Sequence, residues 1–277
     1  MLKEAPIGVF DSGVGGLTVV KEIMSQIPGE KILYFGDTAR VPYGNKSKGT
    51  IITYTRQIVH FLISKGVKAI VVACNTATAL ALETVKEEVD IPIIGVVKPG
   101  AKVAARTTRN GNIGVIGTVA TIQSNIYKEI IREIKPSVRV YQKACPLFVP
   151  LVEEGLIDDP VTIEMARRYI HGLMEEGIDV LVLGCTHYPL LQNTLRRTTK
   201  NQVKLVNPAY ETAKSLKRVL LENNLKRDKI MESYHKFYVS DGADKFREFA
   251  NSILECNVIE TKDINIEELA RIEELRR

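Results

Sequence analysis

The chain has 277 residues and a mass of 30.9 kDa, which corresponds to one large domain or two ordinary ones. Hydrophobic residues make up 45% of it and charged residues 26%, a balance that excludes a chain dominated by disorder. The net charge of +5 is small and dispersed, so we expect no nucleic-acid partner. No apolar stretch approaches the roughly 20 residues of a membrane span, and residues 1–4 do not resemble a signal peptide. We therefore expect a cytoplasmic protein with no membrane partner.

Short β-branched runs alternate with amphipathic segments along most of the chain, a pattern that predicts parallel sheets flanked by helices. The expected strands span residues 7–10, 31–35, 69–73, 113–117, 138–141 and 180–183. Helical spacing predicts one helix after the glycines at 13–16, one that ends at Gly66, one that continues to about residue 134, and one over 161–176. The run at 69–73 is fully apolar, which is typical of a strand covered on both faces.

The sequence also contains an internal repeat. A shift of 111 residues places residues 52–74 on residues 163–185, and seven of the 23 aligned pairs are identical. These pairs are Ile52/Ile163, Arg56/Arg167, His60/His171, Leu62/Leu173, Gly66/Gly177, Val71/Val182 and Cys74/Cys185. We therefore expect an α/β fold with two similar domains, each a mainly parallel sheet flanked by helices.

Cys74 and Cys185 end equivalent strands of this repeat, and each is followed by residues that favour the start of a helix. In open α/β sheets, ligands bind at the carboxyl ends of strands. Backbone N–H groups and the helix dipole at such a position favour a thiolate. The symmetry predicts that the two thiols face each other across an interdomain cleft, which would hold the active site. Two thiols on opposite sides of one carbon can remove a proton from one face and return a proton to the other.

Several other reactive arrangements are not expected. Cys74, Cys185 and His187 are too few for a zinc site, so we expect no metal. No C-x-x-C motif, G-x-G-x-x-G fingerprint or G-K-[ST] phosphate loop occurs, so neither a thioredoxin-like site nor nucleotide binding is supported. We interpret Cys145 and Cys256 as structural residues.

Other polar residues are candidates for the same edge of the sheets. His187 lies two residues beyond Cys185 and could polarise that thiol. The remaining candidates each have a simpler interpretation as turn, surface or capping residues, and they are Asp11, Ser12, Asp37, Tyr43, Gly44, Glu153, Thr118 and Thr121. His60 and His171 are interpreted as structural, and His235 has no context that suggests a role.

Four segments closely resemble motifs of bacterial glutamate racemases, within the aspartate/glutamate racemase superfamily. They are Ile7-Gly8-Val9-Phe10-Asp11-Ser12-Gly13-Val14-Gly15-Gly16-Leu17, Gly36-Asp37-Thr38-Ala39-Arg40-Val41-Pro42-Tyr43-Gly44, Val72-Ala73-Cys74-Asn75-Thr76-Ala77 and Leu183-Gly184-Cys185-Thr186-His187-Tyr188-Pro189-Leu190. The likeness extends over nearly the whole chain. It implies interconversion of L- and D-glutamate without a cofactor, in support of peptidoglycan synthesis.

The resemblance also implies roles for individual residues. Cys74 would deprotonate D-glutamate and Cys185 would deprotonate L-glutamate. Asp11 and His187 would assist the neighbouring thiols, with Asp37 and Glu153 as further candidates. The matched substrate-binding segments are Asp11-Ser12, Tyr43-Gly44, Asn75-Thr76 and Thr186-His187.

The resemblance further suggests a discontinuous first domain and a homodimer. The first domain would comprise residues 1–97 and 209–277, and the second would comprise residues 98–208. Glutamate would be the small-molecule substrate.

Three alternatives stay open at this point. The chain could be another member of the same superfamily, such as an aspartate racemase. It could be a thiol hydrolase or transferase that uses one cysteine and forms a covalent acyl adduct. It could also be a binding protein whose two lobes close on an amino acid, although the paired cysteines argue against this.

Overall fold

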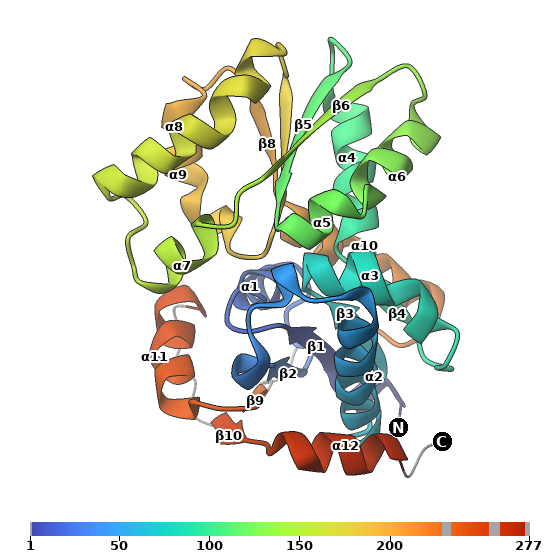
Figure 1. The fold of residues 1–277 in the computed structure, drawn as a ribbon. Helices are drawn as coiled ribbons and strands as arrows, with labels where there is room; N and C mark the ends of the chain where they lie inside the picture. Colours follow the sequence, from blue (N-terminus) through green and yellow to red (C-terminus); the bar gives the residue numbers. More distant parts are fainter. Residues whose placement is uncertain (1, 229–233, 255–260, 275–277) are drawn as a thin grey trace.

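The structure, a computed structural model of the chain, describes residues 2–228, 234–254 and 261–274. Two parallel sheets lie one above the other, each flanked by helices (Figure 1). The predicted α/β architecture with two sheets is therefore confirmed. No helix within the described ranges combines the length and the apolar character needed to cross a bilayer.

The first sheet has six strands in the order β10-β9-β2-β1-β3-β4, and all its neighbouring strands pair in parallel. Its strands are β1 (Ile7–Asp11), β2 (Ile32–Gly36), β3 (Ala69–Val72), β4 (Ile93–Gly95), β9 (Lys236–Val239) and β10 (Thr261–Asp263). The central strands β1, β2 and β3 are buried along their length, as expected for a sheet covered on both faces.

The second sheet has four parallel strands in the order β6-β5-β7-β8. They are β5 (Asn112–Gly117), β6 (Arg139–Ala144), β7 (Val180–Gly184) and β8 (Lys204–Val206). Because β9 and β10 return to the first sheet, that sheet is built from both ends of the described chain. The domain boundaries at residues 97 and 208 stay a prediction.

Helices cover both faces of the first sheet. One face packs against α1 (Leu17–Gln26), α10 (Pro208–Glu222) and α11 (Ala243–Leu254). The other face packs against α2 (Lys48–Ser64), α3 (Asn75–Lys86) and α12 (Ile266–Glu274). This burial of apolar side chains on two faces supplies the main driving force for folding of this half.

The second sheet is covered in the same way. One face packs against α7 (Phe148–Glu153), α8 (Pro160–Glu175) and α9 (Gln192–Thr198), and the other against α4 (Val97–Thr107) and α6 (Ile126–Ile134). The short helix α5 (Val119–Gln123) lies at the carboxyl end of β5, above α3 of the first half (Figure 1).

The internal repeat corresponds to a repeated structural unit. α2 followed by β3 in the first half matches α8 followed by β7 in the second. Both helices are followed by a glycine in the left-handed region, Gly66 with φ +75° and Gly177 with φ +65°. A glycine adopts this conformation without the steric penalty of a Cβ, so it can end a helix at this position. The predicted helix end at Gly66 is therefore confirmed.

The segment from residue 118 to residue 134 differs from the prediction. We expected one helix, but the structure has α5 and α6 separated at Ser124 and Asn125. Asn125 has φ 56°, and its left-handed conformation interrupts the helix before Ile126. Asn tolerates this conformation better than most residues, but the hydrophobic periodicity alone does not report it.

Candidate active site

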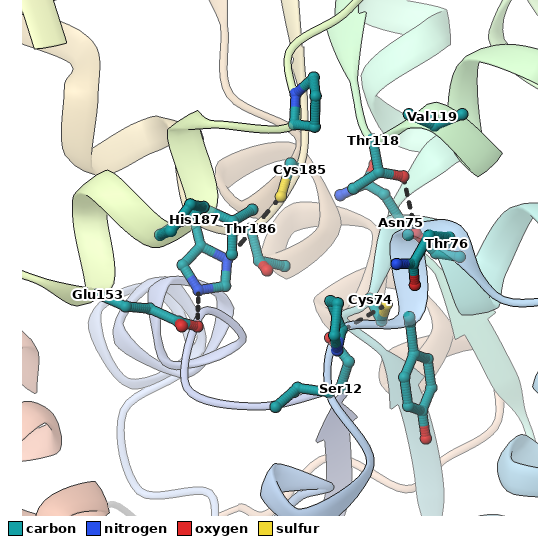
Figure 2. Close-up of a pocket in the computed structure, with 18 residues that line it drawn as sticks. Ser12, Cys74, Asn75, Thr76, Thr118, Val119, Glu153, Cys185, Thr186 and His187 are labelled. Atoms are coloured by element: carbon teal, nitrogen blue, oxygen red, sulfur yellow. Dashed lines mark hydrogen bonds and ion pairs between the residues drawn. The ribbon is translucent and has the colours of Figure 1, made fainter.

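The carboxyl ends of β3 and β7 bring Cys74 and Cys185 to one cavity of about 390 Å³ between the two sheets. Figure 2 shows Cys74 beside Ser12 on one side and Cys185 beside His187 on the other. The cavity is lined by Ser12, Val41, Pro42, Tyr43, Gly44, Asn45, Cys74, Asn75, Thr76, Thr118, Val119, Pro146, Val149, Pro150, Glu153, Cys185, Thr186 and His187. Its volume lies within the range of small-molecule sites, about 300–1,000 Å³.

Cys74 is the N-cap of α3. Its sulfur accepts the Ala77 N–H at 3.5 Å, and its thiol donates to Ser12 Oγ at 3.8 Å. Burial raises the pKa of the Cys74 thiol to about 12, the Asp11 charge adds to this, and the Ala77 N–H opposes it. The N–H group at the helix start thus favours a thiolate, as expected, but desolvation outweighs it and keeps the Cys74 thiol protonated in the free protein.

Cys185, unlike Cys74, lies beside an imidazole, that of His187. Its sulfur is 3.8 Å from His187 Nδ1, and His187 Nε2 is 2.9 Å from Glu153 Oε1. Burial acts to lower the pKa of His187, but the contacts with Cys185 and Glu153 outweigh it and raise the pKa to about 10. His187 is therefore a cation at neutral pH, and this positive charge lies beside the Cys185 sulfur.

Asp11 lies behind the loop that joins β1 to α1. Its Oδ2 accepts the N–H groups of Gly16 at 3.0 Å and Gly13 at 3.2 Å, and its Oδ1 is 3.4 Å from Thr186 Oγ1. Burial raises the pKa of Asp11, while the His187 charge and the Gly16 and Gly13 N–H groups oppose the rise. Asp11 does not line the cavity, so its contacts shape the loop, and its charge acts on Cys74 and His187 from behind the cavity wall.

Three threonine hydroxyls connect the two halves at the cavity wall. Thr76 of α3 lies 2.9 Å from Thr118 and 3.4 Å from Thr121. Thr118 also caps α5 by accepting the Thr121 N–H at 3.2 Å. Thr76 and Thr118 line the cavity, whereas Thr121 is buried behind them. Thr118 is therefore a helix cap, as one of its two interpretations has it, and it also lines the cavity.

Asp37 supports the second loop of the first half and does not line the cavity. This fully buried carboxylate accepts from Arg40 Nε at 2.7 Å, from Ser240 Oγ at 2.9 Å and from the Tyr43 hydroxyl. These contacts fix the 3₁₀ turn Tyr43–Asn45, which places Tyr43 and Gly44 against the cavity.

Sequence reasoning missed part of the site. The apolar wall formed by Pro146, Val149 and Pro150 follows the carboxyl end of β6, and the rule that ligands bind at strand ends could have identified it. Ser240 could not be identified in this way, because it reaches Asp37 from 203 residues further along the chain.

The remaining histidines and cysteines lie elsewhere. His60 is buried in α2, and His171 is exposed on α8 beside Glu175. Cys145 is buried at the end of β6 and does not line the cavity. Cys256 lies outside the described residues. Within the described ranges, no group of three or more His, Cys, Asp or Glu side chains is arranged to hold a metal ion.

Known proteins similar to this chain match it over most of its length. The family described as Asp/Glu/Hydantoin racemase matches residues 7–216. A glutamate racemase of Geobacter metallireducens is 48% identical over 261 residues, covering 94% of this chain and 97% of that protein. The crystal structure of a Bacillus anthracis glutamate racemase isoform superposes with a TM-score of 0.92 at 39% identity, covering 95% of this chain and 98% of that one. A Francisella tularensis glutamate racemase in complex with D-glutamate gives a TM-score of 0.90 at 38% identity, covering 96% and 99%.

Proposed function

The chain belongs to the Asp/Glu/hydantoin racemase family, and from that premise we propose that it interconverts L- and D-glutamate. The observation that carries the proposal is the pair of thiols, which leave equivalent strands of a repeat and line one small cavity. Glutamate racemases that are similar over nearly their full length support glutamate as the substrate. The enzyme would then be an isomerase.

We propose a two-base mechanism in which the substrate Cα lies between the two sulfurs. Starting from L-glutamate, Cys185 as thiolate removes the Cα proton, because His187 beside it carries the compensating charge. Cys74, whose raised pKa keeps it protonated, returns a proton to the opposite face. The reverse reaction starts from the enzyme form that this turnover leaves: Cys74, now without its proton, removes the Cα proton of D-glutamate, and Cys185 returns a proton to the opposite face. Both proton-transfer roles are filled by side chains of the chain, so the proposal requires no cofactor.

The carbanion formed at Cα requires strong electrostatic stabilisation. None of the described residues that line the cavity is a lysine or arginine, so in this mechanism neutral donors and the start of α3 hold the substrate carboxylates. Hydroxyl and amide groups of Ser12, Asn75, Thr76, Thr118 and Thr186 are available. Donors fixed before the reaction stabilise developing charge without reorganisation, and each is typically worth about 2.7–4 kcal/mol.

We further propose a cytoplasmic location, a contribution to peptidoglycan synthesis and a homodimeric state. Cys74 and Cys185 must stay reduced for the proposed chemistry, and a reducing compartment maintains free thiols. The family resemblance supports the peptidoglycan role and the dimer. Light scattering coupled to size-exclusion chromatography tests the dimer, which should have twice the 30.9 kDa mass of one chain.

Circular dichroism on L-glutamate tests the main proposal. Purified protein, dialysed against EDTA and given no cofactor, should drive the signal of L-glutamate to zero as the racemate forms. L-aspartate should be turned over far more slowly. Preferential turnover of L-aspartate would favour an aspartate racemase, and a covalent acyl adduct without racemisation would favour a thiol transferase. Activity that returns only after addition of pyridoxal phosphate or a metal would contradict the cofactor-free mechanism.

A further inference from the structure

Tyr127 connects the neighbours of the two cysteines. It is the second residue of α6 and is fully buried in the second half. Its ring lies against Gly184, where a Cβ would be only 3.2 Å from Tyr127 Cε2. Its hydroxyl lies 2.7 Å from Asn75 Oδ1 across the boundary between the halves. Tyr127 therefore contacts the residue before Cys185 and the residue after Cys74.

The direction of this hydrogen bond follows from the chemistry of the two groups. Burial and the nearby Cys185 raise the pKa of Tyr127 well above its usual value, so the hydroxyl keeps its proton. Within the described residues this proton has no acceptor other than Asn75, so the hydroxyl donates and the amide oxygen accepts. Asn75 lines the cavity, and its NH₂ group donates to no other described residue. The NH₂ group of Asn75 is therefore available to donate a hydrogen bond to a ligand in the cavity.

We propose that Tyr127 is a positioning residue that holds the Asn75 amide with its NH₂ group toward the α-carboxylate of the substrate. This inference rests on the proposed racemisation and adds to it the identity of one carboxylate donor. Asn75 directly follows Cys74, so it lies beside the carbon that Cys74 would protonate. With its carbonyl oxygen occupied by Tyr127, the amide presents a donor, which suits a carboxylate and not an ammonium group.

The contact matters most during the reaction. When the Cα proton leaves, negative charge spreads onto the α-carboxylate, and a donor already aimed at that oxygen becomes stronger. Without the Tyr127 hydroxyl, the amide could rotate and present its carbonyl oxygen to the same negative charge. The effect should therefore appear mainly in kcat and less in KM.

A double-mutant cycle tests whether Tyr127 acts through Asn75. Tyr127→Phe keeps the ring against Gly184 and should lower kcat about tenfold from either enantiomer, while Asn75→Ala should lower it about 100-fold. In the Asn75→Ala background, Tyr127→Phe should change kcat by less than about twofold. The same tenfold loss in both backgrounds would overturn the proposal, because it would show that the hydroxyl acts on the fold as a whole.

Asn75→Asp tests the orientation independently of any Tyr127 variant. The aspartate keeps an oxygen for the Tyr127 hydroxyl but replaces the NH₂ group with a second oxygen. We expect activity at or below that of Asn75→Ala, and near-normal activity would overturn the proposal. Tyr188→Phe is the matched control, because it removes an equally buried hydroxyl that donates to the Cys145 carbonyl at 2.8 Å. Its unfolding midpoint in urea should fall about as much as that of Tyr127→Phe, with kcat nearly unchanged.

The cycle separates this inference from the proposed function. If the wild-type protein does not racemise glutamate, the proposed function itself is refuted. A wild-type protein that racemises glutamate, with Tyr127→Phe equally active, would overturn the role of Tyr127 alone.

Discussion

At the scale of single residues, the two cysteines occupy equivalent positions of a repeat but have different surroundings. Cys74 contacts the Ser12 hydroxyl and a backbone N–H group. Cys185 contacts the His187 imidazole, which is itself hydrogen-bonded to Glu153. Burial raises the pKa of the Cys74 thiol, whereas Cys185 lies beside an imidazole whose own pKa is raised to about 10. The proposed two-base reaction therefore has a protonated thiol on one side of the cavity and a cationic imidazole beside the other thiol.

Replacing either cysteine by alanine should abolish racemisation in both directions, because the proposed two-base mechanism needs both groups in every turnover. In deuterated water, the wild type should place solvent deuterium at Cα of the product. Cys74→Ala should still exchange the Cα proton of L-glutamate through Cys185, whereas Cys185→Ala should do so only with D-glutamate. Proton NMR of the Cα position measures both. Near-normal racemisation by either variant would show that one base is enough.

The charge on His187 predicts the alkaline limit of activity. Its pKa in the folded protein, about 10, lies above the ordinary value of 6.5, so its protonated form stabilises the fold fully below pH 6.5. That stabilisation is lost as the pH rises through about 10, and Cys185 loses its positive partner over the same range. We expect kcat/KM to follow a bell-shaped profile that falls in this range, with limits that belong to the coupled site.

His187→Gln tests the same point, because it removes the charge but keeps a polar side chain. It should lower kcat/KM about 100-fold or more and should make the unfolding free energy less dependent on pH between 7 and 10. Urea titrations at several pH values measure the second effect. A wild-type rate that stays constant from pH 7 to 11 would contradict this assignment.

At the scale of elements, the loop between β1 and α1 is held by close approaches of backbone to side chains. Asp11 accepts two of its N–H groups, and the Tyr34 hydroxyl donates to the Gly13 carbonyl at 2.7 Å. At Gly15, a Cβ would lie 2.4 Å from Thr186 Oγ1 and 2.5 Å from His187 Nδ1. A loop of the first half thus fixes the imidazole of the second half by leaving no space for a side chain.

Gly15→Ala should therefore damage the site more than the fold. The added methyl group must displace the His187 ring, and a shift of about 1 Å at a catalytic group can cost about 100-fold in rate. The loss of stability should be about 1–3 kcal/mol, as for other overpacked positions. Gly49→Ala is the control, because it lies exposed in α2 with no atom within 4 Å of its Cβ. Equal kcat values for the two variants, measured by circular dichroism, would refute this role of Gly15.

The sequence predicts elements better than it predicts contacts between them. The strands at 7–10 and 180–183 agree with β1 and β7 to within one residue, because apolar runs bounded by turn residues report buried strands directly. The break at Asn125 depends on one left-handed residue. The contact of Tyr127 with Asn75 joins residues 52 positions apart in different halves, and no local pattern reports it. The positions of Cys74 and Cys185 were predictable because the repeat places both at strand ends.

At the scale of the whole molecule, the hydrogen bonds that join the halves surround the cavity. Thr76 contacts Thr118 at 2.9 Å, Tyr127 donates to Asn75 at 2.7 Å, and the Thr18 hydroxyl donates to the Thr186 carbonyl at 3.0 Å. The distance between the two thiols is therefore set by how the sheets are joined, and not by either sheet alone. A ligand between the thiols would add a further connection at the same place.

Glutamate should therefore protect both halves together. A ligand that binds only the folded state stabilises it by about 2.7 kcal/mol at a concentration 100 times its Kd, so the thermal midpoint should rise. In hydrogen–deuterium exchange, we expect added protection of the segments 74–78 and 185–191, which follow the two strand ends. Amides of α12, on the side of the first sheet away from the second sheet (Figure 1), should report only the global change. Alanine, which lacks the side-chain carboxylate, is the control and should give much weaker protection at the same concentration. Protection confined to one of the two segments would show that glutamate binds a single half, and the cavity would then not be the bridging site that a two-base reaction needs.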